Sequence, residues 1–235
     1  MDSIPVEGDA PMLGLMIATL LMPVQAGAFG ERENAMRKAP RHDAARQTEE
    51  YTDCLVNEQD KRAAIDQLLR EFPGDGTTSA AGRAAVSEEC VRASMRNYQI
   101  TVKLSYSYEA IRAALYPALY RRDFGRSGPP AGIAALEPLT LSTEFDRDIA
   151  TLPADYRPRR ALGDCVSREA PQDTHALLTA APYSKAEDSA LSALSLPLAK
   201  CLPKGETFRL NRATLRASIG EAMYKLALAA RTPKP

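Results

Sequence analysis

The sequence predicts an all-α protein: a disulfide-stapled three-helix unit that is duplicated, with a Pro- and Gly-rich linker between the two copies. Three observations support this prediction. The four cysteines form two equally spaced pairs, Cys54 with Cys90 and Cys165 with Cys201. An Asp-Cys-apolar motif surrounds the first cysteine of each pair, and a helical segment of the same pattern follows the second. Such a repeat defines an architecture rather than a reaction.

Two aligned helical segments, 111–121 and 215–225, show the duplication most clearly. Each has an apolar row at positions i, i+4 and i+8, as expected for one buried face of a helix. The rows are Ile111, Leu115 and Leu119 in the first segment and Leu215, Ile219 and Met223 in the second. An arginine and a tyrosine flank each row on similar sides of the helix, about two turns apart. These flanking residues are Arg112, Tyr120, Arg216 and Tyr224.

Local signals predict the elements of the first copy, residues 48–123. In order they are a helix over 49–72, a Pro-Gly-Asp-Gly loop at 73–76, a second helix that passes Cys90, an extended stretch at 98–106 and a third helix with Ser107 as its N-cap. The apolar spacing predicts the first helix, and the Pro-Gly pair ends it. Thr78 or Ser79 can cap the second helix, because a hydroxyl there accepts a free backbone N–H.

The second copy, residues 161–231, repeats this plan. Its predicted elements are a helix from about Leu162 that is broken or restarts at Pro171, a turn at Pro182-Tyr183, a helix to Cys201 that Pro197 strains near its end, and a last helix. Ser184 and Glu187 have the spacing of a capping box, and Asn211 can cap the last helix. We expect the last helix to present Leu215, Ile219, Ala222, Met223 and Leu226 to the core.

Two further segments are expected to contribute little regular structure. Residues 124–160 are rich in proline and glycine and are predicted to be a linker, with at most a short helix near Thr143 to Ala150. Residues 29–47 are polar and rich in arginine, and are predicted to be a mobile leader or a loosely held first helix.

Residues 1–28 resemble a signal peptide. The uncharged apolar run from Met12 to Val24 leads into the small-residue sequence Ala26-Gly27-Ala28, and it is too short to span a bilayer. No lysine or arginine precedes the run, so translation that starts at Met12 would fit an export signal better. We therefore expect a periplasmic or secreted protein with no transmembrane anchor after processing. A buried N-terminal helix is the alternative interpretation.

The cysteines agree with export, because an even number in matched pairs is typical of an oxidising compartment. Four cysteines allow three pairings, and the repeat favours Cys54 with Cys90 and Cys165 with Cys201. A four-thiolate zinc site is the competing interpretation, but it normally needs a closely spaced Cys-x-x-Cys pair, which the sequence lacks. We expect no bound metal and no cofactor.

Recognisable catalytic motifs are missing from the sequence. His42 and His175 are the only histidines, and no zinc-protease or nucleophile-elbow motif surrounds them. His175 is interpreted as a solvated helix residue. The 30 Lys and Arg residues balance the 30 Asp and Glu residues, so the charge gives no indication of nucleic-acid binding. No residue is assigned a catalytic role.

The polar residues that recur in both copies are the candidates for a binding site. They are Arg112 with Arg216, Tyr120 with Tyr224, and Asp53 with Asp164. One interpretation is structural: each tyrosine anchors its helix at the core edge while the arginine pairs with an aspartate of a neighbouring helix. The other is that both copies bring these arginines and tyrosines to one common groove.

Part of the second copy resembles a known group of proteins. The stretch Cys201-Leu202-Pro203-Lys204-Gly205, with Leu215-Arg216 and Glu221-Ala222-Met223-Tyr224 downstream, is similar to exported helical proteins of sphingomonad-type bacteria to which no function is assigned. The resemblance covers about residues 160–228 and, more weakly, 48–122. It implies export and a helical architecture, and it implies no active site.

The sequence as a whole predicts an exported cell-envelope protein that acts as a non-catalytic binding or structural module. Its partner would be another envelope protein or a small ligand. Two alternatives are a hydrolase whose acids and tyrosines converge only in the folded chain, and a carrier of an apolar small molecule between the repeats.

Overall fold

Helices and short 3-10 turns are the regular structure of the described residues, which contain no strand. The computed structural model describes residues 41–73, 79–95, 108–145, 147–202 and 210–231, all within the unit Lys38–Pro235. The helices are α2 (Arg41–Asn57), α3 (Arg62–Arg70), α4 (Ala80–Ala85), α5 (Glu88–Met95), α6 (Tyr108–Phe124), α7 (Tyr156–Glu169), α8 (Pro171–Thr179), α9 (Lys185–Ala193), α10 (Ser195–Cys201) and α11 (Arg212–Arg231). The predicted all-α class is therefore confirmed for these residues.

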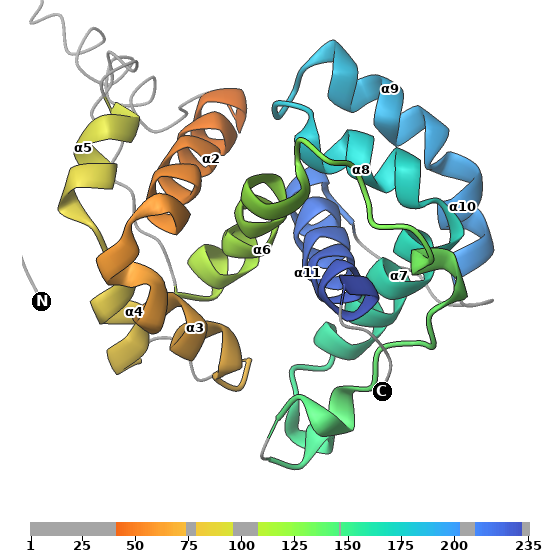
Figure 1. Ribbon diagram of the computed structural model, residues 1–235, viewed down its shortest axis with the longest axis horizontal. Coiled ribbons are helices and arrows are strands. Elements are labelled where there is room, and N and C mark those ends of the chain that lie inside the picture. Colours follow the sequence, from red (N-terminus) through yellow and green to blue (C-terminus); the bar gives the residue numbers. More distant parts are fainter. Residues whose placement is uncertain (1–40, 74–78, 96–107, 146, 203–209, 232–235) are drawn as a thin grey trace, which may run out of the picture. The chain divides into compact units, whose positions relative to one another are not determined.

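Helix α11 lies at the centre of the helical packing. It contacts α6, α7 and α8 (Figure 1). The residues predicted for its inner face are all buried, namely Leu215, Ile219, Ala222, Met223 and Leu226. All of them except Ala222 belong to a cluster with Leu162 and Val166 of α7 and with Leu177 and Leu178 of α8. Burial of such side chains is the main favourable contribution to folding.

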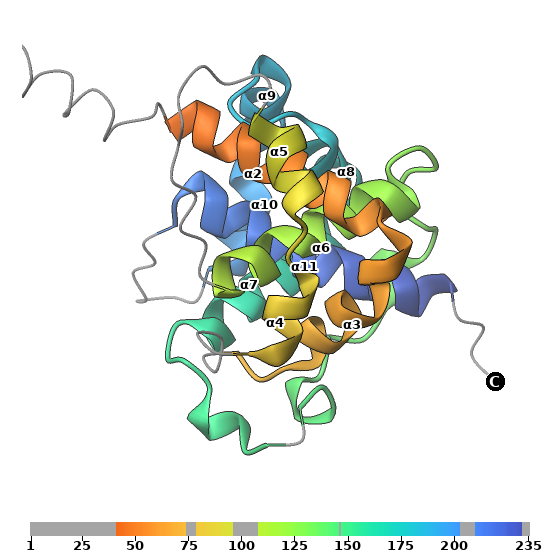
Figure 2. The same ribbon diagram turned by 90° about the vertical axis from the view of Figure 1, so that its left-hand side faces the viewer.

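A second cluster of buried residues forms where α2 contacts α5 and α6 (Figure 2). Tyr51 and Leu55 of α2 pack there with Leu115 and Leu119 of α6. The apolar row predicted for 111–121 thus faces this cluster, while α6 also contacts α11 on another side.

The two disulfides join the predicted pairs. Cys54 of α2 is bonded to Cys90 of α5, and Cys165 of α7 is bonded to Cys201 of α10. The Cα atoms are 5.6 and 5.8 Å apart, which is the usual separation for a disulfide. No free cysteine is present among the described residues.

Glycine allows a close approach of α7 and α11. A Cβ atom added at Gly163 would lie 2.2 Å from the carbonyl oxygen of Ser218, which belongs to the backbone and cannot rotate away. We therefore expect Gly163→Ala to destabilise the protein by about 1 to 3 kcal/mol through overpacking, although alanine favours helices intrinsically. Urea unfolding measures the change. Ala161→Ser adds one atom on an exposed part of the same helix and should have little effect; equal losses in both variants would contradict the close-contact explanation.

Several boundaries in the first half differ from the prediction. The helix expected over 49–72 begins at Arg41, inside the predicted leader, and divides into α2 and α3 because Glu58 adopts an extended conformation. The second predicted helix divides into α4 and α5 at Val86, which is also extended. Ser87 accepts the N–H of Cys90 and so caps α5, while Ser79 caps α4 as predicted.

Residues 124–160 pack more closely than a linker would. They contain 3-10 turns at Ile133–Ala135, Leu141–Thr143 and Ile149–Thr151 in place of the short helix expected near Thr143 to Ala150. Ile133, Phe145 and Leu152 are buried. Helix α7 begins at Tyr156, inside the predicted linker, with Pro158 in its first turn, where a missing N–H costs no intrahelical bond.

The second half follows the prediction more closely. Helix α8 begins at Pro171, the Ser184 hydroxyl accepts the N–H of Glu187, and the Asn211 carboxamide accepts the N–H of Thr214. Pro197, however, lies in the first turn of α10 and does not strain the end of a longer helix, because the chain turns at Leu194.

Some predictions fall outside the described residues. They are the signal peptide (1–28), most of the leader, the loop at 74–76, the extended stretch at 98–106 and the N-cap Ser107. In the described part of the chain, no helix combines the length and the hydrophobicity that crossing a bilayer requires.

Candidate functional site

A groove of about 490 Å³ lies between α2, α6 and α11, next to the first turn of α7 and the loop before α9. Small side chains line much of it, namely Ala45, Ala110, Ala113, Ala114, Pro117, Ala213 and Ala217. Because these side chains are short, the helices leave open space along this face. The volume is within the range of small-molecule sites.

Charged and aromatic side chains border the same groove. Six arginines line it (Arg112, Arg121, Arg159, Arg160, Arg212 and Arg216), together with the glutamates Glu49, Glu187 and Glu221 and the tyrosines Tyr116, Tyr156 and Tyr183. The groove therefore combines an apolar surface with a surplus of basic groups.

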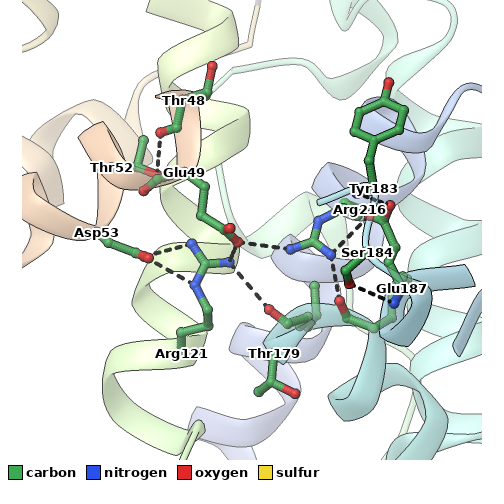
Figure 3. Close-up of polar contacts among 12 residues, drawn as sticks. Thr48, Glu49, Thr52, Asp53, Arg121, Thr179, Tyr183, Ser184, Glu187 and Arg216 are labelled. Carbon is green, nitrogen blue, oxygen red and sulfur yellow. Dashed lines mark hydrogen bonds and ion pairs between the residues drawn. The ribbon is translucent and has the colours of Figure 1, made fainter. Parts of the chain in front are cut away.

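One group of these side chains forms a continuous ion-pair chain in the order Asp53, Arg121, Glu49, Arg216 and Glu187 (Figure 3). Arg121 contacts Asp53 at 2.6 Å and Glu49 at 2.9 Å. Arg216 contacts Glu49 at 3.1 Å and Glu187 at 3.2 Å. The chain thereby connects α2, α6, α9 and α11.

The ion-pair chain leaves its arginines well supplied with acceptors. Besides the carboxylates, Arg216 donates to the carbonyl of Leu177 at 2.6 Å and Arg121 to that of Leu178 at 3.3 Å. Burial raises the pKa of Glu49, although Arg121 and Arg216 lower it. Since each arginine already has two carboxylate partners, this end of the groove is electrostatically satisfied and holds the helices in place.

The loop before α9 is fixed at the edge of the groove. Tyr183 has a φ of 57°, an uncommon conformation for a residue other than glycine. Its N–H donates to Glu187 at 2.7 Å, and its ring stacks on His42 and lies 5.2 Å from the Arg212 guanidinium. These contacts stabilise the strained turn, as is common at binding sites.

A second group, which we call the Glu221 cluster, lies where α6, α7 and α11 meet; it comprises Arg112, Tyr116, Glu144, Tyr156, Arg160, Glu221 and Lys225. Tyr156 donates to Glu221 at 2.7 Å and Lys225 donates to it at 2.8 Å. Arg160 donates to Glu144 at 2.8 Å, and Lys225 also pairs with Glu144. Burial would raise the pKa of Glu221, but Lys225, Arg160 and Arg112 lower it to about 2.

Arg112 differs from the arginines of the ion-pair chain. It is only 4% exposed, and its guanidinium donates to the carbonyl of Leu69 at 3.2 Å. Its Nε atom is buried without a hydrogen-bond partner, and the same is true of Nε and Nη1 of Arg160. No carboxylate among the described residues forms an ion pair with Arg112 within 4 Å.

The predicted candidate residues are only partly brought together. Arg112 and Arg216 both line the groove, whereas Tyr120 and Tyr224 do not. The Tyr120 hydroxyl lies 3.0 Å from Nδ1 of His175, and Tyr224 donates to Asp123 at 3.1 Å. Tyr224, which is partly buried against the core, thus has the edge position that the structural interpretation proposed, whereas Tyr120 is fully buried inside the core.

Neither Arg112 nor Arg216 pairs with an aspartate: Arg216 pairs with glutamates instead, and both arginines donate to backbone carbonyls. Arg112 donates to Leu69 in the last turn of α3, and Arg216 donates to Leu177 in the last turn of α8. Carbonyls at a helix C-terminus lack intrahelical partners and attract cations. Asp53 instead pairs with Arg121, and Asp164 pairs with Arg168.

His175 is not the solvated helix residue that the sequence indicated. It is partly buried, and its Nδ1 atom is engaged with the Tyr120 hydroxyl. Burial lowers its pKa, which favours the neutral imidazole. Its contacts lie with the core around Tyr120 rather than with the groove.

One cluster of potential metal ligands occurs among the described residues, at Cys54, Glu58 and Cys90. The two sulfurs are bonded to each other, so they offer no thiolate. Glu58 accepts a hydrogen bond from the Ser87 hydroxyl at 2.7 Å, and its carboxylate lies 3.0 Å from the Cys90 sulfur. With the disulfide formed, these residues are a structural crosslink.

Sequence reasoning missed much of the Glu221 cluster. Arg160 had been assigned to an exposed linker, and Tyr156 had not been singled out. Glu221 aligns with Pro117 in the segment 111–121, so a comparison of the two aligned segments could not reveal it. The i, i+4 spacing of Tyr156 and Arg160 was the available signal, because it places both side chains on one helix face.

Comparisons with protein-family models, with curated proteins and with solved structures gave no significant match to this chain. The resemblance to exported helical proteins of sphingomonad-type bacteria therefore stays a prediction. The geometry of the groove is the basis for the functional proposal below.

Proposed function

We propose that this chain is an exported, non-catalytic binding protein that holds a small organic molecule in the groove between α2, α6 and α11. The observation that carries the proposal is the groove itself. It has about 490 Å³ of space, an alanine-rich surface and a few convergent arginine and tyrosine side chains. This combination of apolar area with a small number of polar groups is typical of ligand sites.

The proposal includes export and an internal duplication. The two disulfides support export, because such bonds persist in oxidising compartments. Matching contacts support the duplication: α2 contacts α5 and α6 in the first half as α7 contacts α10 and α11 in the second. In the first half Arg112 also donates to a carbonyl in the last turn of α3, and in the second half Arg216 donates to a carbonyl in the last turn of α8.

A hydrolase is less well supported than a binding protein. Neither described histidine lines the groove: His42 stacks on Tyr183, and His175 is engaged by Tyr120. The lining hydroxyls of Thr214 and Ser218 bond within α11 or its N-cap. The groove hydroxyl that does donate to a carboxylate is that of Tyr156, whose partner is Glu221. Neighbouring cations lower the pKa of Glu221 to about 2, which makes this carboxylate a weak general base.

A neutral fluorescent dye tests the groove directly. N-phenylnaphthylamine should bind the wild-type protein with one-to-one stoichiometry, because it is apolar and fits the available space. Ala217→Trp fills the groove from α11 and should weaken this binding by about tenfold or more. Fluorescence titration measures both affinities.

The matched control is Ala229→Trp, which places the same side chain on an exposed part of α11 outside the groove. It should bind the dye as the wild type does. Absence of stoichiometric dye binding, or equal loss in both tryptophan variants, would contradict the proposed function.

A further inference from the structure

We infer that the ligand of this groove is a monovalent organic anion, a carboxylate on an apolar body, and that Arg112 receives its negative charge. This inference rests on the proposed function and specifies the chemistry of its ligand.

Charge balance in the Glu221 cluster is the first argument. Arg112, Arg160 and Lys225 supply three positive charges, whereas Glu144 and Glu221 supply two negative charges. Burial raises the pKa of Tyr116 and Tyr156, so both phenols stay neutral and cannot offset the excess. One monovalent anion would neutralise the cluster.

Unsatisfied hydrogen-bond donors are the second argument. Arg112 is 4% exposed and hydrogen-bonds to the Leu69 carbonyl and to the side chain of Tyr156, which is neutral, yet its Nε atom has no acceptor. Nη1 of Arg160 is also buried without an acceptor. Buried donors and buried charges without partners are costly, so natural proteins seldom keep them without a compensating group.

The ion-pair chain provides an internal comparison. Arg121 and Arg216 line the same groove but have two carboxylates each. An anion at those residues would have to displace a protein carboxylate. At Arg112 the anion would accept hydrogen bonds from a guanidinium that pairs with no carboxylate of the described residues. The groove therefore has one preferred end for a negative charge.

The surroundings of Arg112 suit a carboxylate that is attached to an apolar body. The guanidinium lies 5.8 Å from the centre of the Tyr116 ring and 6.0 Å from that of Tyr156, which restricts its orientation. A planar guanidinium recognises a carboxylate through paired N–H donors. Ala113 and Ala114 of α6 and Ala217 of α11 line the groove and can contact the apolar body.

Octanoate and octanol form a matched pair of probes, because they share an eight-carbon chain and differ in charge. Each is titrated against bound N-phenylnaphthylamine on the full chain at neutral pH and constant ionic strength. Octanoate should displace the dye at about tenfold lower concentration than octanol, since a hydrogen bond to a charged group contributes more than one to a neutral group.

Arg112→Met tests the residue assignment. It should weaken octanoate binding by about tenfold or more and leave octanol binding unchanged. Arg126→Met removes the same charge from an exposed position outside the groove and should change neither affinity. Circular dichroism of both variants reports whether they fold.

The outcomes separate this inference from the proposed function. Dye and octanol binding without a preference for octanoate in the wild type would overturn the inference and leave the binding groove intact. Equal weakening of octanoate and octanol by Arg112→Met in a folded protein would overturn the assignment to Arg112. No stoichiometric binding of the dye or either probe would overturn both proposals. If Arg112→Met does not fold, the wild-type comparison still decides whether the ligand is an anion.

Discussion

Replacing Glu221 by glutamine is expected to destabilise the protein by about 3 to 5 kcal/mol at neutral pH. Glu221 is 7% exposed and accepts hydrogen bonds from Tyr156 and Lys225, with Arg160 Nε 3.5 Å away. Its removal leaves Arg112, Arg160 and Lys225 with Glu144 as the remaining carboxylate of the cluster. A buried charge that loses its partner is far more costly than a surface charge.

The destabilisation should depend on pH in a defined direction. The neighbouring cations lower the pKa of Glu221 from 4.5 to about 2 in the folded protein. A carboxyl group whose pKa is lower in the folded than in the unfolded protein stabilises the fold. This stabilisation is complete when the pH is above the unfolded-state pKa, and it is lost as the pH falls through the folded-state pKa. The difference between wild type and Glu221→Gln should therefore be constant above about pH 5 and shrink between about pH 4.5 and pH 2.

Urea unfolding at several pH values measures this difference. Glu137→Gln serves as the control, because Glu137 is exposed and its replacement removes the same charge. Its effect on the free energy of unfolding should be within about 0.5 kcal/mol. A loss in Glu221→Gln that is the same at pH 2.5 and pH 7 would show that packing, not charge, is responsible.

Removal of the Cys165–Cys201 disulfide by paired alanine substitutions is expected to cost about 2 to 5 kcal/mol. The bond closes a long loop and so restricts the unfolded chain. It also holds α10, which has no fully buried residue of its own and carries Leu196 with 64% of its surface exposed. We expect α10 to lose protection from hydrogen exchange before the rest of the protein unfolds.

The Cys54–Cys90 disulfide is the natural comparison. Its second helix, α5, buries Cys90 and Ser94, so it retains packing when the covalent bond is removed. Replacing Cys54 and Cys90 by alanine should lower the urea midpoint. We expect α5 to lose less of its protection from hydrogen exchange in that variant than α10 loses in the Cys165→Ala, Cys201→Ala variant. Unchanged unfolding and unchanged protection of α10 in the Cys165→Ala, Cys201→Ala variant would contradict the prediction.

Local signals account for the features that the sequence predicted well. The cysteine spacing identified both disulfides. Ser184 and Asn211 marked the starts of helices, because each side chain accepts the backbone N–H of the residue three positions later. The break at Val86 was missed because good helix formers stand on both sides of it, the alanines of α4 before it and Glu88 and Glu89 after it, and they favour a continuous helix. Packing and the Ser87 cap override that preference.

The candidate site could be predicted only in part. Arg112 and Arg216 were found because they occupy matching positions in the two aligned segments 111–121 and 215–225. Their partners could not be found in that way, because the ion pair of Arg216 with Glu49 and the hydrogen bond of Tyr156 with Glu221 join segments far apart in the sequence. Tertiary packing determines such pairs, and a single sequence contains no local signal for them.

The central position of α11 has a consequence for the order in which the molecule matures during synthesis. Every helix that α11 contacts precedes it in the chain, and Arg216 meets Glu49 across 167 residues. Before α11 has been made and has packed, the faces of α6, α7 and α8 that contact it are uncovered, and both the ion-pair chain and the Glu221 cluster lack members. The groove is therefore among the last features to appear in a newly made molecule, and an intermediate that stops before α11 exposes the surface that chaperones and proteases recognise.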